Sequence, residues 1–161
     1  MAKKEGAVAL ARVTIRFSES EADIEARIEM ACRAHEEMDD GLPFDRERVR
    51  QFFEWRLMKP DRCLLQAERG GRVIGGLIGV IAAHPHSPAL GASLEGYYVL
   101  PEHRGSLAAI KLLHGFRRWA RERGAVRLYV GITSGINVWR TDRLLRRLGF
   151  LQTGGNYRLS L

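Results

Sequence analysis

One segment of the chain, from Tyr98 to Ala109, constrains the fold most strongly. Its apolar first part ends at Pro101, an Arg-Gly step follows at Arg104 and Gly105, and small and apolar residues then open a long helical pattern. A chain that passes from a strand into a helix through such a step leaves unpaired backbone N–H groups at the helix start. Those groups and the positive end of the helix dipole form a site for a polyanion such as a pyrophosphate. The segment therefore predicts an α/β unit with an anion site at its strand-to-helix junction.

Hydrophobic periodicity predicts alternating strands and helices along the rest of the chain, with Ser18, Ser20 and Asp45 as candidate N-caps. The expected elements are a strand at 12–17, a helix at 21–38, a helix between Asp45 and Pro60, strands at 62–68, 72–83 and 93–100, a helix at 105–123, a strand at 126–132, a helix at 137–148 and a final strand, whole or broken, within 150–161. The stretch 84–91 holds two prolines and is expected to be a loop. The order β-α-α-β-β-β-α-β-α-β predicts one α/β (α+β) domain over residues 1–161, with a mixed central sheet and helices on both faces.

The composition is that of an ordinary globular domain. The 161 residues are 45% hydrophobic and 28% charged, which is sufficient for a core without cross-links. Cys32 and Cys63 lack metal-ligand spacing, so we expect two buried or half-buried thiols and no metal site. No apolar run is long enough to span a bilayer and no secretory pattern opens the sequence, so we expect a cytoplasmic protein without a membrane partner.

The net charge of +7 comes mostly from arginines on the last two predicted helices. No aromatic residues alternate with these arginines, as a platform for stacked bases requires. A solvated cationic face is therefore favoured over a nucleic-acid surface. Attraction of a polyanionic cofactor or an acidic partner is the alternative.

Two blocks of residues together resemble a known family. Arg104 and Ala109 occupy the first and last positions of an Arg/Gln-x-x-Gly-x-Gly/Ala signature that follows a strand ending in Val-x-Pro, here Val99-Leu100-Pro101. The second block runs through Gly135-Ile136-Asn137, Thr141, Leu144 and Arg147-Leu148-Gly149-Phe150. With the element order, these blocks resemble the GNAT superfamily of N-acetyltransferases from Arg12 to the end of the chain.

The chain departs from the family pattern at two positions. Leu107 stands where the middle glycine of the signature usually lies, so its side chain could narrow the approach to the backbone amides. Leu145 stands where many members carry the tyrosine thought to protonate the leaving thiolate. Leu145 has no proton to give, so another group serves, no acid is needed, or the protein does not catalyse.

The resemblance implies acetyl-CoA or another acyl-CoA as cofactor. Its pyrophosphate is expected on the backbone N–H groups of Arg104, Gly105, Ser106, Leu107, Ala108 and Ala109. The pantetheine arm is expected along the strand edge near Val99 and Leu100, in the manner of an added strand. Asn137 and Thr141 are expected to flank the arm or the thioester, with an N-cap role as the alternative for Asn137.

Acyl transfer to an amine needs a deprotonated nucleophile, because a free alkylammonium has a pKa of about 10. Glu95 is the candidate base, and an exposed or ion-paired carboxylate is its alternative. Strand alternation predicts Glu95, Tyr97 and Val99 on one face and Tyr98 on the other. Tyr97 or Tyr98 is the candidate acid, with core packing as the alternative.

The resemblance places the amine acceptor at the first two helices and their loop. That region is acidic, with Glu36, Glu37, Asp39 and Asp40 followed by Phe44. We expect Glu37, Asp39, Asp40 and Phe44 to line an acceptor pocket for a cationic amine, and a solvated helix end is the alternative.

The leading hypothesis is an acetyl-CoA-dependent N-acetyltransferase that acts on a primary amine of a small molecule or peptide by direct attack in a ternary complex. A catalytically silent CoA-binding or regulatory module on the same fold is the second hypothesis. A basic nucleic-acid-binding domain, suggested by the pI near 10, is the third. A homodimer is expected from the family alone.

Overall fold

A computed structural model describes residues 12–159, and residues 1–11 and 160–161 lie outside the described part. The elements in chain order are β1 (Thr14–Phe17), α1 (Glu21–Met38), α2 (Arg46–Leu57), β2 (Arg62–Arg69), β3 (Arg72–His84), β4 (Ser87–Val99), a short 3-10 helix (Pro101–His103), α3 (Ala108–Glu122), β5 (Ala125–Val130) and α4 (Val138–Arg147). The predicted α/β class is confirmed, and so is the predicted order from the first strand through the last helix.

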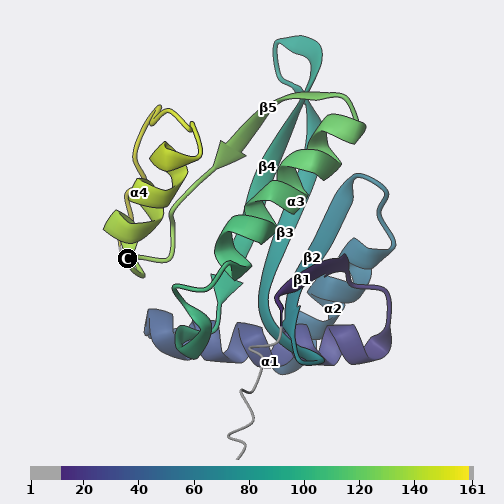
Figure 1. Cartoon of the computed structure of the whole chain (residues 1–161), viewed down its shortest axis with the longest axis vertical. Helices are drawn as coiled ribbons and strands as arrows, with labels where there is room; N and C mark the ends of the chain where they lie inside the picture. Colours follow the sequence, from purple (N-terminus) through teal and green to yellow (C-terminus); the bar gives the residue numbers. More distant parts are fainter. Residues whose placement is uncertain (1–11, 160–161) are drawn as a thin grey trace, which may run out of the picture.

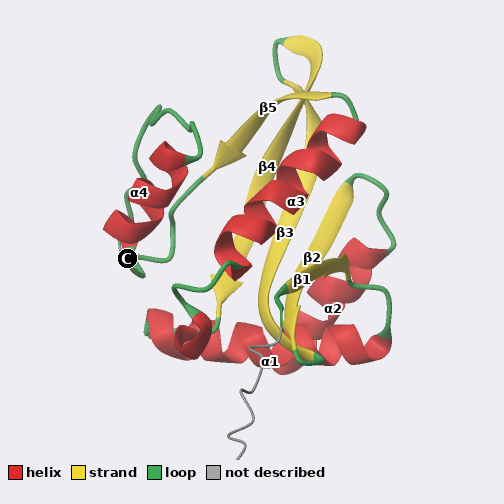
Figure 2. Ribbon diagram, in the orientation of Figure 1, coloured by secondary structure: helices red, strands yellow, loops and turns green. Residues whose placement is uncertain are grey.

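The five strands form one mixed sheet in the order β1-β2-β3-β4-β5. The first four strands are antiparallel neighbours, and β5 returns parallel to β4 after the crossover through α3. Helices α1 and α2 cover one face of the sheet and α3 crosses the other, while α4 lies beside the far end of β5 (Figures 1 and 2). Helices therefore cover both faces, as predicted.

Each sheet face carries its own apolar core. The larger core lies under α3, where Leu112, Phe116 and Trp119 are buried against the strands. The smaller one lies under α1 and α2 and is built around Ile28 and Phe53. The two cores hold α1 and α3 against opposite faces of the sheet. The last turns of α1 and the first turn of α3 therefore both lie near the end of β4.

A buried polar network fixes the junction between β1 and α1. Ser20 caps α1 and forms a reciprocal capping box with Asp23. The Asp23 carboxylate also accepts hydrogen bonds from Arg16 at 2.6 and 2.9 Å and from the Gln66 amide at 2.9 Å. Arg27, which is 2% exposed, donates to Ser18 Oγ at 2.7 Å. Each buried polar side chain of this network thus has a partner, as burial requires.

Two sequence expectations about the strands are wrong. The stretch 84–91 is mostly strand, because β3 and β4 form one long hairpin with a register shift between Ala83 and His84. Pro88 lies in that shift, where no ladder partner needs its missing N–H. The final strand is not formed within the described residues: residues 151–159 are irregular and exposed, and the glycine pair at 154–155 interrupts their apolar pattern.

Candidate active site

The loop between β4 and α3 leaves four backbone donors free. The N–H groups of Gly105, Leu107, Ala109 and Ile110 make no hydrogen bond to any described residue. Gly105 has a φ of +88°, which turns the chain into the helix and favours glycine. Four free donors at the start of a fifteen-residue helix form an anion site.

The other three amides of the predicted phosphate loop are used internally. The N–H of Arg104 donates to Pro101 O at 3.2 Å, that of Ser106 to His103 O at 3.3 Å, and that of Ala108 to Ser106 Oγ at 3.3 Å. Three of the six amides predicted to bind the pyrophosphate, from Arg104 through Ala109, are therefore occupied by hydrogen bonds within the loop. These alternate amides stabilise the loop, and the other three stay free.

Leu107 does not distort the loop. Its φ of −73° is accessible to any residue, and its side chain is 58% exposed. The glycine usual at this position is thus not required by the backbone conformation of this chain.

The Arg104 side chain ties the loop to α1. It binds both carboxylate oxygens of Glu37 at 2.5 and 2.6 Å, and its Nε donates to Val99 O at 3.0 Å. The Tyr98 hydroxyl donates to the same carboxylate at 2.9 Å. The Arg104 hydrogen bond holds the pKa of Glu37 below its ordinary value, and burial beside Glu37 raises the pKa of Tyr98 to about 12. Glu37 is therefore occupied by the loop instead of facing an acceptor.

A second ion pair repeats this link one turn earlier on α1. Arg33 binds the two carboxylate oxygens of Glu102 at 2.8 and 2.9 Å. Both side chains are about half exposed, so this pair is weaker than the Glu37–Arg104 pair. Together the two pairs fasten the last two turns of α1 to the loop.

Strands β4 and β5 part before β4 ends. Their pairing runs from Leu90 to Leu94 and stops, and Figure 1 shows β5 diverging from the rest of β4. Leu100 N–H donates to Ile74 O of β3, so by alternation the backbone groups of Tyr97 and Val99 point away from β3. This half of β4 therefore presents an unpaired edge to an extended ligand.

Glu95 occupies a β-bulge, which overturns the predicted alternation. Leu94 pairs with Gly79 and Gly96 with Ile78, so Glu95 is the extra residue between two adjacent partners. Its carboxylate turns to α2, where Arg56 Nε donates to it at 3.0 Å. The side chains of Glu95 and Tyr98 therefore lie on the sheet face covered by α1 and α2, whereas Tyr97 and Val99 pack in the core under α3.

Arg56 was not foreseen as a site residue. Its side chain is 14% exposed and its guanidinium lies 3.3 Å from the centroid of the Phe52 ring, which fixes its position. The sequence offered one signal, an arginine one turn after an aromatic residue on a predicted helix. Only the fold brings that helix to Glu95.

Tyr97 and Leu145 lie in the same apolar cluster. Leu145 is 8% exposed and packs where the family tyrosine would stand. The Tyr97 hydroxyl is buried without a hydrogen-bond partner among the described residues, and burial raises its pKa above the ordinary range. An orphaned buried hydroxyl beside the unpaired edge of β4 is suited to a polar ligand atom.

Asn137 precedes α4 in the left-handed conformation, with a φ of 46°. It is the N-cap residue of α4 by position, as the alternative interpretation has it, but its side chain bonds no backbone amide and is available to a ligand. Thr141 lies one turn further along α4 and is half-buried.

The remaining predicted acceptor residues shape the loop between α1 and α2. Asp39 ends α1 in the left-handed conformation, and Asp40 accepts a hydrogen bond from Leu42 N–H at 3.1 Å. Phe44 packs against His35 with ring centroids 5.4 Å apart. Neither aspartate forms an ion pair with a described cation.

A model of the Acetyltransferase (GNAT) family matches residues 28–150. The chain belongs to this family. The expected acetyltransferase is thereby confirmed, and enzymes of the family use acetyl-CoA. No curated protein sequence matches the chain.

Solved structures share the fold over almost the whole chain. A transcriptional regulator from Bacillus halodurans C-125 aligns with a TM-score of 0.76 at 19% identity, over 93% of this chain and 100% of its own. AAC(6')-Iy in complex with the bisubstrate analog CoA-S-monomethyl-acetylneamine aligns with a TM-score of 0.75 at 19% identity, over 94% and 100%. A ribosomal-protein-alanine N-acetyltransferase from Brucella melitensis biovar Abortus 2308 gives 0.72 at 17% identity, over 93% and 99%. These identities establish the fold alone.

Residues 12–159 contain neither a metal-ligand cluster nor a membrane-spanning helix. No group of His, Cys, Asp or Glu side chains among residues 12–159 is arranged to hold a metal ion. Within the same residues, no helix combines the length and apolar character needed to cross a membrane.

Proposed function

We propose that the protein transfers an acetyl group from acetyl-CoA to a primary amine of a small molecule or peptide. The observation that carries the proposal is the continuity of unpaired backbone groups from the free edge of β4 to the start of α3. An extended arm followed by a pyrophosphate needs this succession of an open strand edge and an anion site.

The residues present fit such a cofactor. The free amides at the start of α3 would hold the pyrophosphate, and the outward backbone groups of Tyr97 and Val99 would pair with the amides of the pantetheine arm. Asn137 and Thr141 would approach it from α4. When bound, acetyl-CoA supplies a thioester whose carbonyl carbon can be attacked by an amine.

Glu95 is the proposed base. The bulge directs its carboxylate to the α1–α2 side, and the Arg56 hydrogen bond fixes its orientation. A carboxylate that is 27% exposed can take a proton from an ammonium ion directly or through one water. Arg56 thus acts as a positioning residue for Glu95.

Tyr97 is proposed as a hydrogen-bond donor to the leaving sulfur. Because burial raises its pKa, the phenol keeps its proton and does not act as a full acid. A thiol with a pKa of about 8.5 leaves acceptably as a thiolate, so a stabilising hydrogen bond is sufficient and the loss of the family tyrosine is tolerated.

The acceptor is proposed to be cationic. Asp39 and Asp40, at the loop between α1 and α2, are carboxylates without a cationic partner in the described chain. Aminoglycosides and the alanine of a ribosomal protein are the acceptors to test first, because the similar structures include an aminoglycoside antibiotic 6'-N-acetyltransferase and a ribosomal-protein-alanine N-acetyltransferase.

Calorimetry with acetyl-CoA and a thiol-release assay with an amine panel test this function. We expect cofactor binding, turnover with at least one cationic amine, and a kcat at least tenfold lower in Glu95→Gln with an unchanged cofactor Kd. The matched control is Glu47→Gln, since Glu47 is an exposed α2 carboxylate bonded only to Gln51. Unchanged turnover in Glu95→Gln would remove Glu95 as the base, and absence of cofactor binding would refute the proposal.

A silent CoA-binding module is the second candidate, favoured by the leucine at position 145 in place of an acid. It predicts that acetyl-CoA binds but that no amine of the panel releases thiol.

A further inference from the structure

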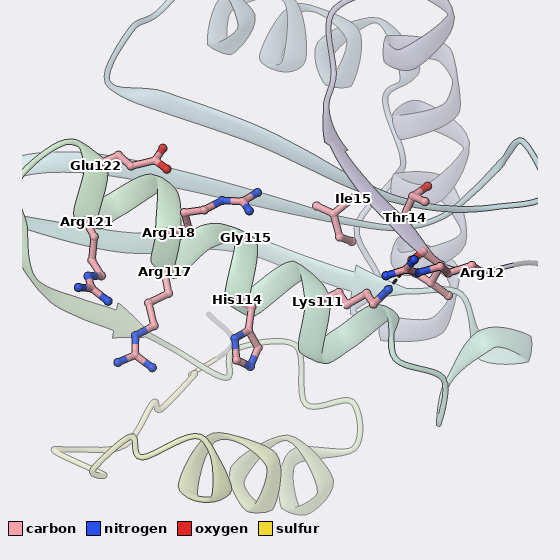
Figure 3. A pocket seen from close by; sticks show the side chains of 11 residues that line it. Arg12, Thr14, Ile15, Lys111, His114, Gly115, Arg117, Arg118, Arg121 and Glu122 are labelled. Atoms are coloured by element: carbon pink, nitrogen blue, oxygen red, sulfur yellow. Dashed lines mark hydrogen bonds between the residues drawn. The ribbon is translucent and has the colours of Figure 1, made fainter.

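A basic groove lies between the edge strand β1 and helix α3 (Figure 3). It has a volume of about 1050 Å³, which is large enough for a peptide segment. Its cationic lining residues are Arg12, Lys111, Arg117, Arg118 and Arg121. Glu122 is the one carboxylate among the lining residues.

The positive charge of the groove is not neutralised within residues 12–159. None of its five cations forms an ion pair, although most arginines of β1, α1 and α2 are paired with carboxylates. Uncompensated charge of one sign in a concave surface attracts an oppositely charged partner. The groove is therefore built for an anionic ligand.

The β1 wall of the groove adds an open strand edge. Ser18 N–H donates to Leu64 O of β2 at 2.8 Å, so by alternation the backbone groups of Val13, Ile15 and Phe17 point outward. Two of the outward carbonyl groups already accept side-chain hydrogen bonds: Lys111 Nζ donates to Val13 O at 2.6 Å and Arg16 Nη1 to Phe17 O at 3.0 Å. The N–H and C=O of Ile15 have no partner among the described residues. An incoming strand can pair there.

The α3 wall of the groove brings two cations to the edge of β1. Lys111 and Arg118 extend from α3 toward β1 in Figure 3, on either side of Gly115. Gly115 lies where α3 is close to both β2 and β1, since a Cβ there would lie 3.3 Å from Leu65 Cδ1 and 3.4 Å from Ile15 Cγ2. Lys111 and Arg118 lie two turns apart, about 10.5 Å along the helix, whereas carboxylates on alternate residues of a strand are about 6.7 Å apart, so the long lysine and arginine side chains must bend to meet two carboxylates of one strand.

We propose that this groove binds an acidic peptide in extended conformation, added to β1 as a strand with its carboxylates toward α3. Nucleic acid is disfavoured, because His114 is the one aromatic side chain among the lining residues, and a site for single-stranded nucleic acid stacks successive bases on several aromatic rings. The groove involves neither the free amides at the α3 start nor the open edge of β4. It is a second binding surface, independent of the acyl-transfer site.

The probe is a fluorescein-labelled peptide of alternating glutamate and valine, seven residues long, titrated with the full chain by fluorescence anisotropy. Two further peptides are N-methylated at every valine or at every glutamate. Only one edge of an added strand pairs with β1, so one methylated peptide should lose at least tenfold in affinity and the other should bind like the parent. Equal affinity of the two methylated peptides would overturn strand addition.

The protein variant is Lys111→Gln/Arg118→Gln, and its matched control is Arg143→Gln/Arg147→Gln on α4, which removes the same charge elsewhere. We expect about tenfold weaker peptide binding in the groove variant only, as the loss of two exposed ion pairs predicts. Equal loss in both variants would show attraction by net charge alone and overturn the proposal.

Three other ligands of the groove would each give a different result, and each result would contradict the binding of an acidic peptide. Tighter binding of a twelve-nucleotide single strand than of the peptide would indicate nucleic acid. Self-association in sedimentation that disappears in Lys111→Gln/Arg118→Gln would indicate a second copy of the chain. Competition between acetyl-CoA and the peptide would assign the groove to the cofactor. Each of these results would overturn the proposal, and none of them bears on whether the proposed acetyl transfer occurs.

Discussion

Breaking the Glu37–Arg104 ion pair should loosen the junction between α1 and the β4–α3 loop. The two side chains are 28% and 23% exposed, and two short hydrogen bonds join them. Arg104 also contacts Val99 O and the Tyr98 ring, so a single substitution removes more than the ion pair. A double-mutant cycle of Glu37→Ala and Arg104→Ala cancels those additional contacts.

The coupling free energy should be about 1–2 kcal/mol. Fully exposed ion pairs contribute about 0.2–1 kcal/mol and hydrogen bonds to charged groups about 1.5–3 kcal/mol, so a pair shielded on most of its surface falls between them. The control is the pair Arg146–Asp142 on α4, whose side chains are 54% and 40% exposed. As an exposed i,i+4 pair, it should give about 0.3–0.5 kcal/mol.

Urea unfolding followed by circular dichroism measures both cycles at pH 7. The pKa of Glu37 is lowered in the folded state, so its contribution is present above the ordinary glutamate pKa of about 4.3 and is lost as pH falls through the folded-state value. The coupling should therefore shrink toward pH 3. A coupling no larger than that of the control pair, or one that does not change with pH, would refute the role assigned to this contact.

Three further predictions concern the loop between β4 and α3, the sheet and the buried thiol of Cys63. Gly105→Ala forces a side chain into a φ of +88° and should weaken acetyl-CoA binding at least tenfold by calorimetry, whereas an unchanged Kd would exclude the loop as the phosphate site. Gly79→Ala places a Cβ 2.8 Å from Cys63 Sγ and against the Phe116 ring, and should lower the urea-unfolding free energy by about 1–3 kcal/mol. The Cys63 thiol, whose pKa burial raises to about 12, should react with a thiol reagent at pH 8 only after denaturant is added.

Acid stability provides one more measurement, because Arg16 holds the pKa of Asp23 far below its ordinary value. The contribution of Asp23 to stability is present above the ordinary aspartate pKa of about 3.9 and is lost as pH falls toward the folded-state value. Wild type should therefore lose stability between pH 5 and pH 2 more steeply than Asp23→Asn, and parallel curves of urea midpoint against pH would contradict this.

Local signals made most elements of the fold predictable. The N-caps Ser20 and Asp45 and the apolar residues at helical spacing lie close together in the sequence. The helices α1 and α2 therefore form where this local pattern predicts them. The hairpin between β3 and β4 was missed because two prolines look like a loop, whereas a bulge accommodates Pro88. The turn between β4 and α3 was predictable for the same reason as the helices, since its residues are adjacent in sequence.

The contacts of the candidate site residues were not predictable in this way. Alternation assumes an unbroken strand, and the bulge at Glu95 depends on how β4 registers against β3. The partners of Glu95 and Arg104 come from positions 39 and 67 residues away along the chain. No local pattern encodes such pairings, and they exist only once both sheet faces are covered.

The early end of β5 pairing also has a dynamic consequence for β4. Up to Leu94 this strand has neighbours on both sides, whereas from Glu95 to Val99 it has a neighbour on one side only. Its backbone amides that face the missing neighbour should exchange with solvent much faster than those directed to β3. A bound pantetheine arm would take the place of the absent strand, so the cofactor would complete the sheet as well as deliver the acetyl group. The last five residues of β4 would then reach their full rigidity only when the cofactor is bound.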